Sequence, residues 1–491
     1  MNTALPVLLL ATSLVPALVT FFLREESERK RNAVNLAGAF AKLGLVVVML
    51  DGVRRGEDYE FRFAFVPGLE MLLQVDALAL LFVTLSAFLW LLTTIYAIAY
   101  FRGGSDLSRF FGFFSLCVAA TTGIALSGTL ITFFIFYELL TLSTWPLVVH
   151  KGDAKSLAAG RRYLAYTLAG SAVLLLAIVW LESMTGPVEF AAPSDLRRLD
   201  DMTLRFVFAL FVLGIGVKAA IFPLHGWLPT AMAAPAPVSA LLHAVAVVKA
   251  GAFGIVRVIY DVFGIALVAE LGVGLPLAFV ASFTILYGSV RALQQRDIKK
   301  RLAYSTVSQV SYIILGAALA GPFATIGGLV HLVHQGLMKI TMFFCAGIFA
   351  ERAGITSIDG LAGMGRRMPW TAIAFSVAAL GMIGVPPIAG FVTKWYLGIG
   401  ALQAGQTWVI AVLAGSALLN AAYFLPLIYR LWYQPGEDIV RADAQALERP
   451  LALIAPPVVT AAAALLAGLM AGLALSPLGW ATLIVERTYW P

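Results

Sequence analysis

Charged side chains are scarce in this sequence. Asp, Glu, Lys and Arg together make up 12% of its 491 residues, and hydrophobic residues make up 60%. Soluble domains carry about 25% charged residues, and the mean hydropathy of +0.90 is far too high for a soluble core to absorb. Apolar segments of about 20 residues, long enough to cross a bilayer, recur along the whole chain. The composition therefore excludes a soluble enzyme and predicts an all-α polytopic membrane protein.

Cysteine is scarce as well. The two cysteines, Cys117 and Cys345, lie inside apolar runs and form no CxxC pattern, which excludes a disulfide framework and a cysteine-based metal site. No haem, iron–sulfur, nucleotide or zinc motif is found, so we expect no cofactor and no bound metal. The glycines of the GxG at 214–216 lie within an apolar run and favour helix packing over a phosphate loop. The net charge of +7 fits basic loops better than nucleic-acid binding.

Apolar windows and helix breakers predict fourteen membrane spans in one transmembrane domain, 1–491. The polar connections are too short to hold a soluble domain; the longest are 51–71, 184–203 and 433–450. The predicted spans are 4–23, 33–51, 72–100, 111–128, 130–149, 161–183, 204–235, 237–261, 266–292, 301–319, 322–350, 369–403, 407–432 and 451–476.

The distribution of basic residues predicts the orientation. Loops after odd-numbered spans, with their flanks, hold 21 lysines and arginines, whereas the other loops and both termini hold 7. Because basic loops stay in the cytoplasm, both termini are expected outside the cell membrane.

Prolines interrupt spans seven and twelve. The seventh contains Pro223, with Lys218 before it and His225 after it, and the twelfth contains Pro386 and Pro387. A proline removes a helical hydrogen bond, which a membrane tolerates only where protein or a hydrated cavity satisfies the backbone. Broken helices at matching places indicate an internal repeat with the transport path at the breaks. The predicted units are spans 4–8 (111–261) and spans 9–13 (266–432), flanked by 1–110 and 451–491; five spans is an odd number, so the second unit is inverted.

Several ionisable side chains fall inside the predicted spans. Each buried charge costs at least about 2.5–3.5 kcal/mol, and the fold by itself does not require them. Glutamate, lysine and histidine exchange protons when their surroundings shift their proton affinity, so the set predicts a proton relay. These residues are Glu138, Lys218, Lys249, His331, His334, Lys339 and Lys394.

Each of these residues also has a structural alternative. Glu138 and Lys218 could form a static pair, Lys249 and Lys339 could extend their stems to the interface, and histidines often only pack. His243 lies near a span end, and Asp76 and Arg257 are close enough to span ends to be interfacial. Lys42 has no evident partner and stays unexplained. An inert scaffold would not need so many costly residues, which favours the functional interpretation.

Four segments carry a resemblance to a known family: FYELLTLSTWPLV (136–148), GVKAAIFPLHGWLPTAMAAPAPVSALLHAVAVVKAG (216–251), DIKKRLAYSTVSQVSY (297–312) and GVPPIAGFVTKW (384–395). The chain resembles the antiporter-like proton-translocating subunits shared by respiratory complex I, membrane-bound hydrogenases and multisubunit Mrp cation/proton antiporters. The resemblance implies fourteen spans and two inverted five-helix repeats. It places the family's proton-translocating positions on Glu138, Lys218, Lys249, His331, His334 and Lys394, with His225, His243 and Lys339 as further candidates.

The lysine at 394, where some family members carry glutamate, looks more like the Mrp D subunit than the subunit-4 type of complex I. The chain also ends soon after span fourteen, without the lateral helix or long extension of two other family types. The resemblance thus implies a subunit of a Na⁺ or K⁺/proton antiporter in a bacterial inner membrane, not itself an enzyme, with other membrane subunits, lipid and protons as partners. The alternative is a proton-pumping subunit of a complex I-like or hydrogenase-like redox complex.

Overall fold

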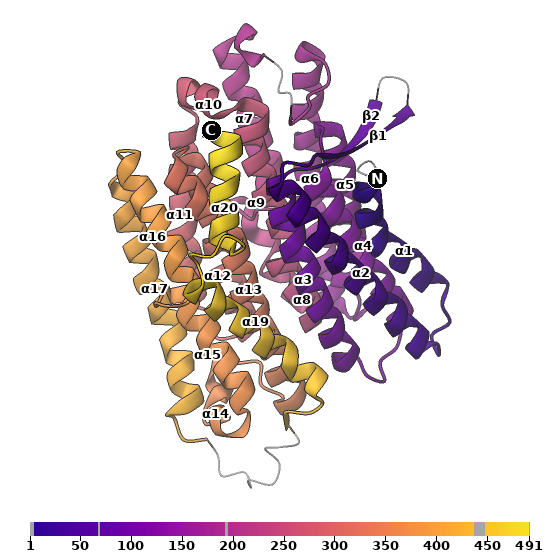
Figure 1. Ribbon diagram of the computed structural model, residues 1–491. Coiled ribbons are helices and arrows are strands. Elements are labelled where there is room, and N and C mark those ends of the chain that lie inside the picture. Colours follow the sequence, from indigo (N-terminus) through magenta and orange to yellow (C-terminus); the bar gives the residue numbers. More distant parts are fainter. Residues whose placement is uncertain (1–3, 67–68, 192–194, 437–446, 491) are drawn as a thin grey trace.

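Long apolar helices dominate the structure (Figure 1). The computed structural model describes residues 4–66, 69–191, 195–436 and 447–490, and within these ranges eleven helices are long and apolar enough to cross a membrane. They are α1 (Leu5–Phe22), α2 (Glu28–Arg54), α3 (Ala77–Tyr100), α4 (Leu107–Leu126), α5 (Leu130–Val148), α6 (Ala154–Thr185), the segment Ala236–Phe263, α11 (Gly274–Leu293), α13 (Pro322–Ala353), α17 (Trp408–Trp432) and α19 (Leu451–Leu469). The predicted polytopic all-α membrane fold is confirmed.

Three predicted spans fall outside that set of eleven because their helices are short or polar. They correspond to α7 (Asp201–Gly216), α12 (Ile298–Ala318) and the pair α15 (Pro369–Ile383) and α16 (Ala389–Gln403). The total of fourteen spans and the inverted repeats stay predictions.

A β-hairpin precedes α3, where the sequence predicted a polar connection, 51–71. Strands β1 (Tyr59–Val66) and β2 (Leu69–Val75) pair antiparallel, with Tyr59 opposite Val75. The third span was expected to begin at 72, but α3 begins at Ala77, because the Asp76 carboxylate accepts a hydrogen bond from the Ala79 N–H at 2.6 Å and caps the helix.

The first broken span has no second half-helix. After α7 the chain passes through a turn and two short 3₁₀ segments, η2 (Leu224–Trp227) and η3 (Thr230–Ala233), where the sequence predicted a span to 235. Pro223 and Pro229 lack the N–H groups that a continuous helix would use.

The eighth predicted span is also interrupted. It consists of α8 (Ala236–Ala244) and α9 (Val247–Arg257), separated at 245–246, and ends in the π-helical turn η4 (Val258–Phe263). The segment Ala236–Phe263 as a whole agrees with the predicted eighth span, 237–261. In the twelfth span, residues 384–388 separate α15 from α16, and this interval contains Pro386 and Pro387.

Shorter elements complete the chain. They are η1 (Leu196–Arg198), α10 (Ile265–Leu271), η5 (Ile358–Leu361), α14 (Met364–Arg367), α20 (Pro477–Ile484) and the π-helical turn η7 (Val485–Tyr489). The last predicted span, 451–476, is shorter than expected, because α19 ends at Leu469.

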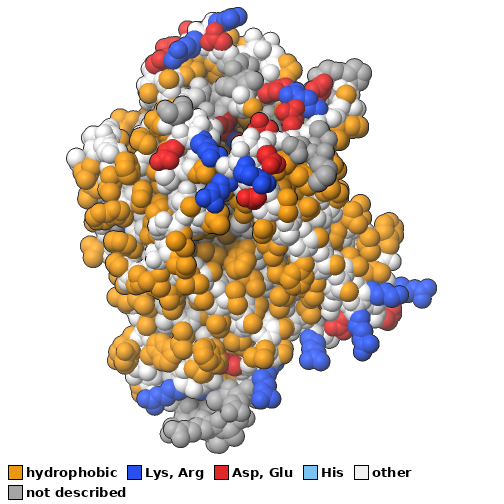
Figure 2. Space-filling model, viewed as in Figure 1, with side chains coloured by type: hydrophobic (Ala, Val, Ile, Leu, Met, Phe, Trp, Pro, Cys, Tyr) orange, Lys and Arg blue, Asp and Glu red, His pale blue; other side chains and the backbone are white. Residues whose placement is uncertain are grey.

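Helix α13 forms the centre of the molecule: every residue from Ala324 to Phe349 is buried, and it packs against α8, α12, α15, α16 and α19. On the visible outer surface, hydrophobic side chains cover the middle, and charged side chains gather at the upper and lower ends (Figure 2). That distribution fits a protein surrounded by a bilayer. A Cβ on Gly214 would lie 2.7 Å from the Leu174 nitrogen, so Gly214, the first glycine of the GxG at 214–216, lets α7 pack closely on α6.

Candidate functional site

The predicted ionisable residues lie on helices that pack against one another in succession. Glu138 is on α5, Lys218 follows α7, Lys249 is on α9, His331 and His334 are on α13, and Lys394 is on α16. Helix α9 contacts both α5 and α7, α12 lies between α9 and α13, and α13 packs on α16. We call these six residues the polar row.

Glu138 and Lys218 are neighbours but do not form a closed ion pair. The Ser171 hydroxyl on α6 donates to the Glu138 carboxylate. Lys218, 1% exposed, donates from Nζ to the Tyr137 carbonyl, and its Nζ lies 3.3 Å from the centroid of the Tyr137 ring. Across the described residues, no contact of 4.0 Å or less joins the ammonium of Lys218 to the carboxylate of Glu138. This arrangement argues against a static staple.

The turn after α7 places Lys218 beside α5. Trp227 Nε1 donates to the Val217 carbonyl at 2.7 Å and pins the turn. A Cβ on Gly251 of α9 would lie 2.2 Å from the Ala219 nitrogen. The glycine therefore lets the α9 backbone approach the chain directly after Lys218, two residues along the helix from Lys249.

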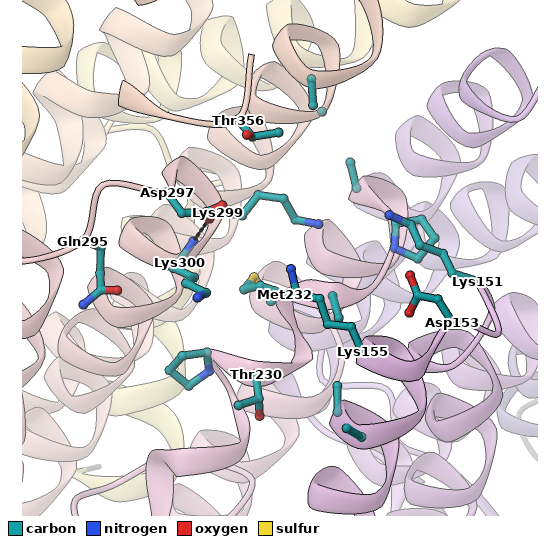
Figure 3. A pocket seen from close by; sticks show the side chains of 18 of the residues that line it. Lys151, Asp153, Lys155, Thr230, Met232, Gln295, Asp297, Lys299, Lys300 and Thr356 are labelled. Atoms are coloured by element: carbon teal, nitrogen blue, oxygen red, sulfur yellow. Dashed lines mark hydrogen bonds between the residues drawn. The ribbon is translucent and has the colours of Figure 1, made fainter. Parts of the chain in front are cut away.

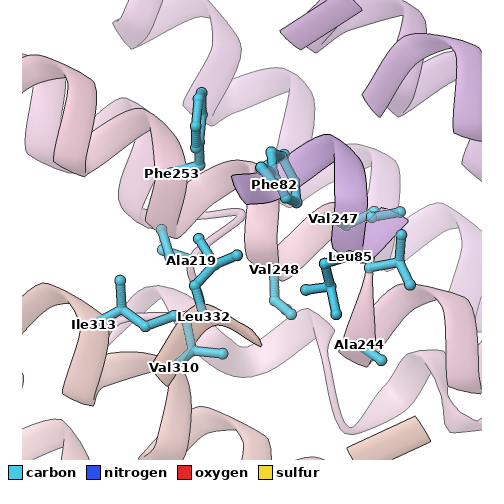
Figure 4. Close-up of a cluster of buried hydrophobic side chains, with 14 of the residues drawn as sticks. Phe82, Leu85, Ala219, Ala244, Val247, Val248, Phe253, Val310, Ile313 and Leu332 are labelled. Carbon is cyan, nitrogen blue, oxygen red and sulfur yellow. The ribbon is translucent and has the colours of Figure 1, made fainter. Parts of the chain in front are cut away.

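Lys249 is fully buried, and its Nζ has no hydrogen-bond partner in the described part of the chain. Apolar side chains from four helices and the turn after α7 surround this stretch of α9 (Figure 4); they include Phe82, Leu85, Ala219, Val248, Phe253, Val310, Ile313 and Leu332. The whole segment Ala236–Phe263 is enclosed by protein. Lys249 therefore does not reach the interface, and its amine faces a low-dielectric interior.

The histidines of α13 lie where buried polar atoms without protein partners gather. The His331 ring centroid is 5.2 Å from that of Tyr312 on α12, and His334 Nδ1 lies 3.2 Å from Thr393 Oγ1, one residue before Lys394. Within the described residues, unpartnered side-chain atoms on α12 and α13 belong to Gln309, Tyr312, His331, His334 and Gln335. Buried polar groups usually have protein or water partners, so internal water suits this region.

Two further predicted histidines have other neighbours. The His243 ring on α8 packs 4.5 Å from the Phe343 ring, with no partner for either nitrogen among the described residues. His225 on η2 packs among Phe222, Tyr287 and Tyr304. None of these aromatic residues belongs to the polar row.

Lys394 binds the end of the preceding half-helix. Its Nζ donates to the carbonyls of Ile383 and, at 3.4 Å, Met382, the last two residues of α15. The carbonyl end of a helix carries partial negative charge, which stabilises an ammonium group. The break after α15 thus creates the cation-binding position that Lys394 occupies.

A side-chain network missed by the sequence analysis connects Lys339 with the same half-helix end. Lys339 Nζ donates to Ser305 Oγ at 2.6 Å and to the Leu302 carbonyl at 3.2 Å, so it does not reach the interface. The Tyr423 hydroxyl on α17 donates to the side-chain oxygen Oδ1 of Asn420 and lies 3.0 Å from Ser305 Oγ. Asn420 Nδ2 in turn donates to the Met382 carbonyl at 3.1 Å. In the sequence, only Asn420, a lone asparagine in the apolar run of α17, could have indicated this network. Tyr423 looks like an aromatic residue that only packs.

The buried cations outside the polar row are explained by local contacts. Lys42 donates to Ser13 Oγ at 3.0 Å and Thr122 Oγ1 at 2.5 Å, and lies 5.3 Å from the Trp90 ring centroid. Arg257 is buried, not interfacial, and its Nη1 pairs with Asp76 at 2.6 Å and Asp261 at 2.8 Å. In the ranges that the structure describes, no group of three or more His, Cys, Asp or Glu is placed to hold a metal ion.

Comparison with known proteins identifies the family. The family described as "NADH:quinone oxidoreductase/Mrp antiporter, TM" matches residues 127–419. The NADH-quinone oxidoreductase subunit N of Desulforudis audaxviator is 34% identical over 474 residues, covering 93% of this chain and 94% of that protein. A probable K(+)/H(+) antiporter subunit of Rhizobium meliloti is 31% identical over 84% of this chain, and the match spans 42% of that longer protein.

Solved structures share the whole fold. A chain of the Mrp complex from Dietzia sp. DQ12-45-1b superposes with a TM-score of 0.82 at 26% identity, covering 98% of this chain and 99% of that one. A chain of an archaeal membrane-bound sulfane sulfur reductase shares the fold with a TM-score of 0.86 at 22% identity. The chain belongs to the NADH:quinone oxidoreductase/Mrp antiporter family, as a multi-pass, proton-translocating antiporter-like subunit of the kind that works with other membrane subunits in Mrp, complex I or hydrogenase-type complexes.

Proposed function

We propose that this chain is the proton-translocating subunit of an Mrp-type Na⁺ or K⁺/proton antiporter, and that protons move along the polar row from Glu138 to Lys394. The observation that carries this proposal is Lys249, a fully buried amine without a partner among the described residues, between the Glu138–Lys218 site and the histidines of α13. A buried amine without a counter-ion is costly as a cation, so a proton placed on it is readily passed on.

The contacts suggest how each part works. The Lys218 ammonium rests on a carbonyl and an aromatic face, and these contacts are weaker than a closed pair with a carboxylate. If the Lys218 side chain moved a short way toward Glu138, the carboxylate would stabilise the proton on Lys218. If the side chain moved away, the proton would be released toward Lys249. His331 and His334 offer ring nitrogens that accept and donate protons. Lys394, on the α15 carbonyls, is the last member of the row.

The antiporter assignment is supported by the match to the Dietzia Mrp complex over nearly the full length of both chains and by the lysine at position 394. The exchanged cation is proposed to be bound elsewhere in the complex, because the row is built from amines and imidazoles and offers one carboxylate, Glu138.

The test uses the complete complex in everted membrane vesicles. A pH gradient is formed, Na⁺ or K⁺ is added, and the loss of the gradient is followed with a fluorescent amine. Glu138→Gln and Lys249→Met are each expected to abolish cation-dependent proton movement, with assembly intact on native gels. Lys30→Gln, which removes an exposed cation from the first turn of α2, serves as the control. Normal exchange by an assembled Lys249→Met complex would refute the proposed route.

The second candidate is a proton-pumping subunit of a redox-driven complex. The specific observation in its favour is the 34% identity to a complex I subunit N over almost the full length of both proteins. In that case cation addition to the vesicles changes nothing, and proton uptake requires an electron donor and a quinone. The same Lys249→Met variant would then stop redox-driven proton uptake.

A further inference from the structure

A large hollow opens at one end of the molecule, where the beginnings of α6 and α12 face each other. It has a volume of about 700 Å³. Five cationic side chains line it: Lys151, Lys155, Arg162, Lys299 and Lys300. Its floor is apolar or uncharged and includes Tyr100, Met232, Pro235 and Gly347. In Figure 3, Lys299 extends from one side of the hollow, and Lys151 and Lys155 extend from the other.

None of these five cations has a carboxylate within 4.0 Å in the described part of the chain. Two carboxylates lie at the rim, but each caps a helix. Asp153 accepts from the Ser156 N–H at 2.6 Å, and Asp297 accepts from the Lys300 N–H at 2.8 Å. Around Lys299, the charges of Lys151 and Lys155 repel its ammonium and that of Asp297 attracts it. The five cations of the hollow outnumber its two carboxylates, so the lining keeps an excess of positive charge.

Further features make this hollow favourable for an anion. Helices α6 and α12, of 32 and 21 residues, both begin here, and the N-terminal end of a helix carries partial positive charge. Lys299 is held in place, because its Nζ donates to the Ala234 carbonyl at 2.5 Å. By contrast, cations such as Lys30 on α2 and Arg366 on α14 are exposed and do not line the hollow.

We propose that the hollow binds a phosphate group, carried either by the head group of an anionic phospholipid or by a free phosphate ion. Phosphate offers several acceptor oxygens and a charge that neutralises converging lysines, and basic pockets at the ends of membrane helices suit lipid head groups. Lys151 comes from the α5–α6 connection and Lys155 from the first turn of α6, whereas Lys299 and Lys300 come from α12. A bound phosphate therefore joins these two parts of the molecule.

The experiment measures binding directly, so its outcome does not depend on the proposed transport function. The purified complex is placed in micelles containing phosphatidylglycerol or phosphatidylcholine, and retained lipid is counted by native mass spectrometry. Inorganic phosphate is titrated in a separate calorimetric arm. The double variant Lys155→Gln/Lys299→Gln removes a cation from each side of the hollow. As the matched control, Lys30→Gln/Arg366→Gln removes two exposed cations that lie outside it.

If a lipid head group is the ligand, the complex should retain phosphatidylglycerol in preference to phosphatidylcholine. This retention should fall at least about tenfold in Lys155→Gln/Lys299→Gln and stay unchanged in the control variant. Saturable phosphate binding with the same pattern of loss identifies the free ion. Lys155→Arg/Lys299→Arg keeps both charges and should restore binding, which separates charge from misfolding. Equal retention of both lipids together with no phosphate binding, or equal losses in the hollow and control variants, would overturn the proposal.

Discussion

The hydrogen-bond partners of individual lysines distinguish fixed charges from exchangeable ones. The two hydroxyls that accept from Lys42 give their own hydrogens to backbone carbonyls: Thr122 Oγ1 donates to Val118 at 2.8 Å, and Ser13 Oγ to Leu10 at 3.2 Å. Each oxygen therefore presents lone pairs to Lys42, and the Trp90 face lies beside them. This site suits a permanent ammonium, whereas Lys249 has no such partners among the described residues.

Lys42→Met is accordingly expected to leave cation-dependent proton exchange close to normal. The substitution removes a fixed charge that the polar row does not use. The rate of cation-dependent proton exchange in vesicles is measured for Lys42→Met and for Lys249→Met, which replace two equally buried lysines. Loss of exchange in a fully assembled Lys42→Met complex would instead make Lys42 part of the route.

Three substitutions at Lys394 separate proton transfer from electrostatic anchoring. Lys394→Ala should stop exchange, since it removes the titratable group. Lys394→Glu should retain part of the activity, because a carboxyl group can also carry a proton. Lys394→Arg keeps the charge that binds the α15 carbonyls, but arginine does not release its proton in proteins, so exchange should fail. Near-normal dissipation of the pH gradient with Lys394→Arg would show that Lys394 acts only as a charge.

At the scale of elements, the start of α4 shows how the N-terminal helices are held together. Asp106 precedes α4 but makes no capping bond; instead, Glu25, from the α1–α2 connection, accepts from the N–H groups of Leu107 and Ser108. Burial alone would raise the pKa of Glu25, but these hydrogen bonds and nearby Arg31 hold the pKa below its usual value. The carboxylate form is thus favoured by the fold.

Glu25→Gln should therefore lower the melting temperature at neutral pH, by about 1–3 °C because a partly exposed group contributes less than about 1 kcal/mol. The stabilisation is present above the usual carboxyl pKa of about 4.3 and is lost as pH falls through the lower folded pKa. Melting curves of detergent-solubilised protein should converge for the two forms at acidic pH. A constant difference at every pH would assign the effect to packing.

How far the sequence predicts these elements depends on the kind of signal. Long apolar runs predicted the helices, since a span needs about 20 apolar residues, and prolines marked both breaks. The hairpin before α3 was missed because the alternation in YEFRFAFV lies in a stretch read as a polar connection. The interruption at 245–246 has no proline or polar signal in the sequence.

The candidate site was predictable at its charged positions and not at its neutral ones. Buried lysines and Glu138 are conspicuous because they are costly in a membrane. Ser171, Thr393 and Asn420 are ordinary polar residues in helices, and only the tertiary structure brings them to Glu138, His334 and the α15 end. The partners of Lys42 likewise come from two other helices, so its environment was not readable from local sequence.

At the scale of the whole molecule, both ends of the described chain lie toward the same face (Figure 1). Arg487 donates to the carbonyls of Val53, at 3.2 Å, and Arg54, at 3.0 Å, at the end of α2. This face lies opposite the α1–α2 connection (Figure 1). The structure thus places both ends toward the same face, and the bias of basic loops predicts which side of the membrane they occupy.

Cysteine labelling in intact cells tests that orientation. Val485 is buried, so the exposed Glu486 is the better site. Glu486→Cys should react with a membrane-impermeant maleimide, and Gln294→Cys, in the connection before α12, should not. The native cysteines provide a clean background, because Cys117 and Cys345 are both buried. Labelling of Gln294→Cys from outside would reverse the predicted orientation.

The contacts of the last described residues also constrain the order of assembly during synthesis. Tyr489 reaches Asp261 at 3.5 Å, and Asp261 pairs with Arg257, the residue that holds Asp76 at the start of α3. Arg487 donates a hydrogen bond to the carbonyl of Val53 near the end of α2, 434 residues earlier in the chain. The ribosome makes residues 485–489 after all of these helices, so the face formed by α2, α3 and the end of α9 stays open until these residues have been synthesised. The helices made earlier therefore remain in the membrane with this face uncovered until residues 485–489 bind to it. During that time the face is accessible to insertion factors or to neighbouring proteins of the complex.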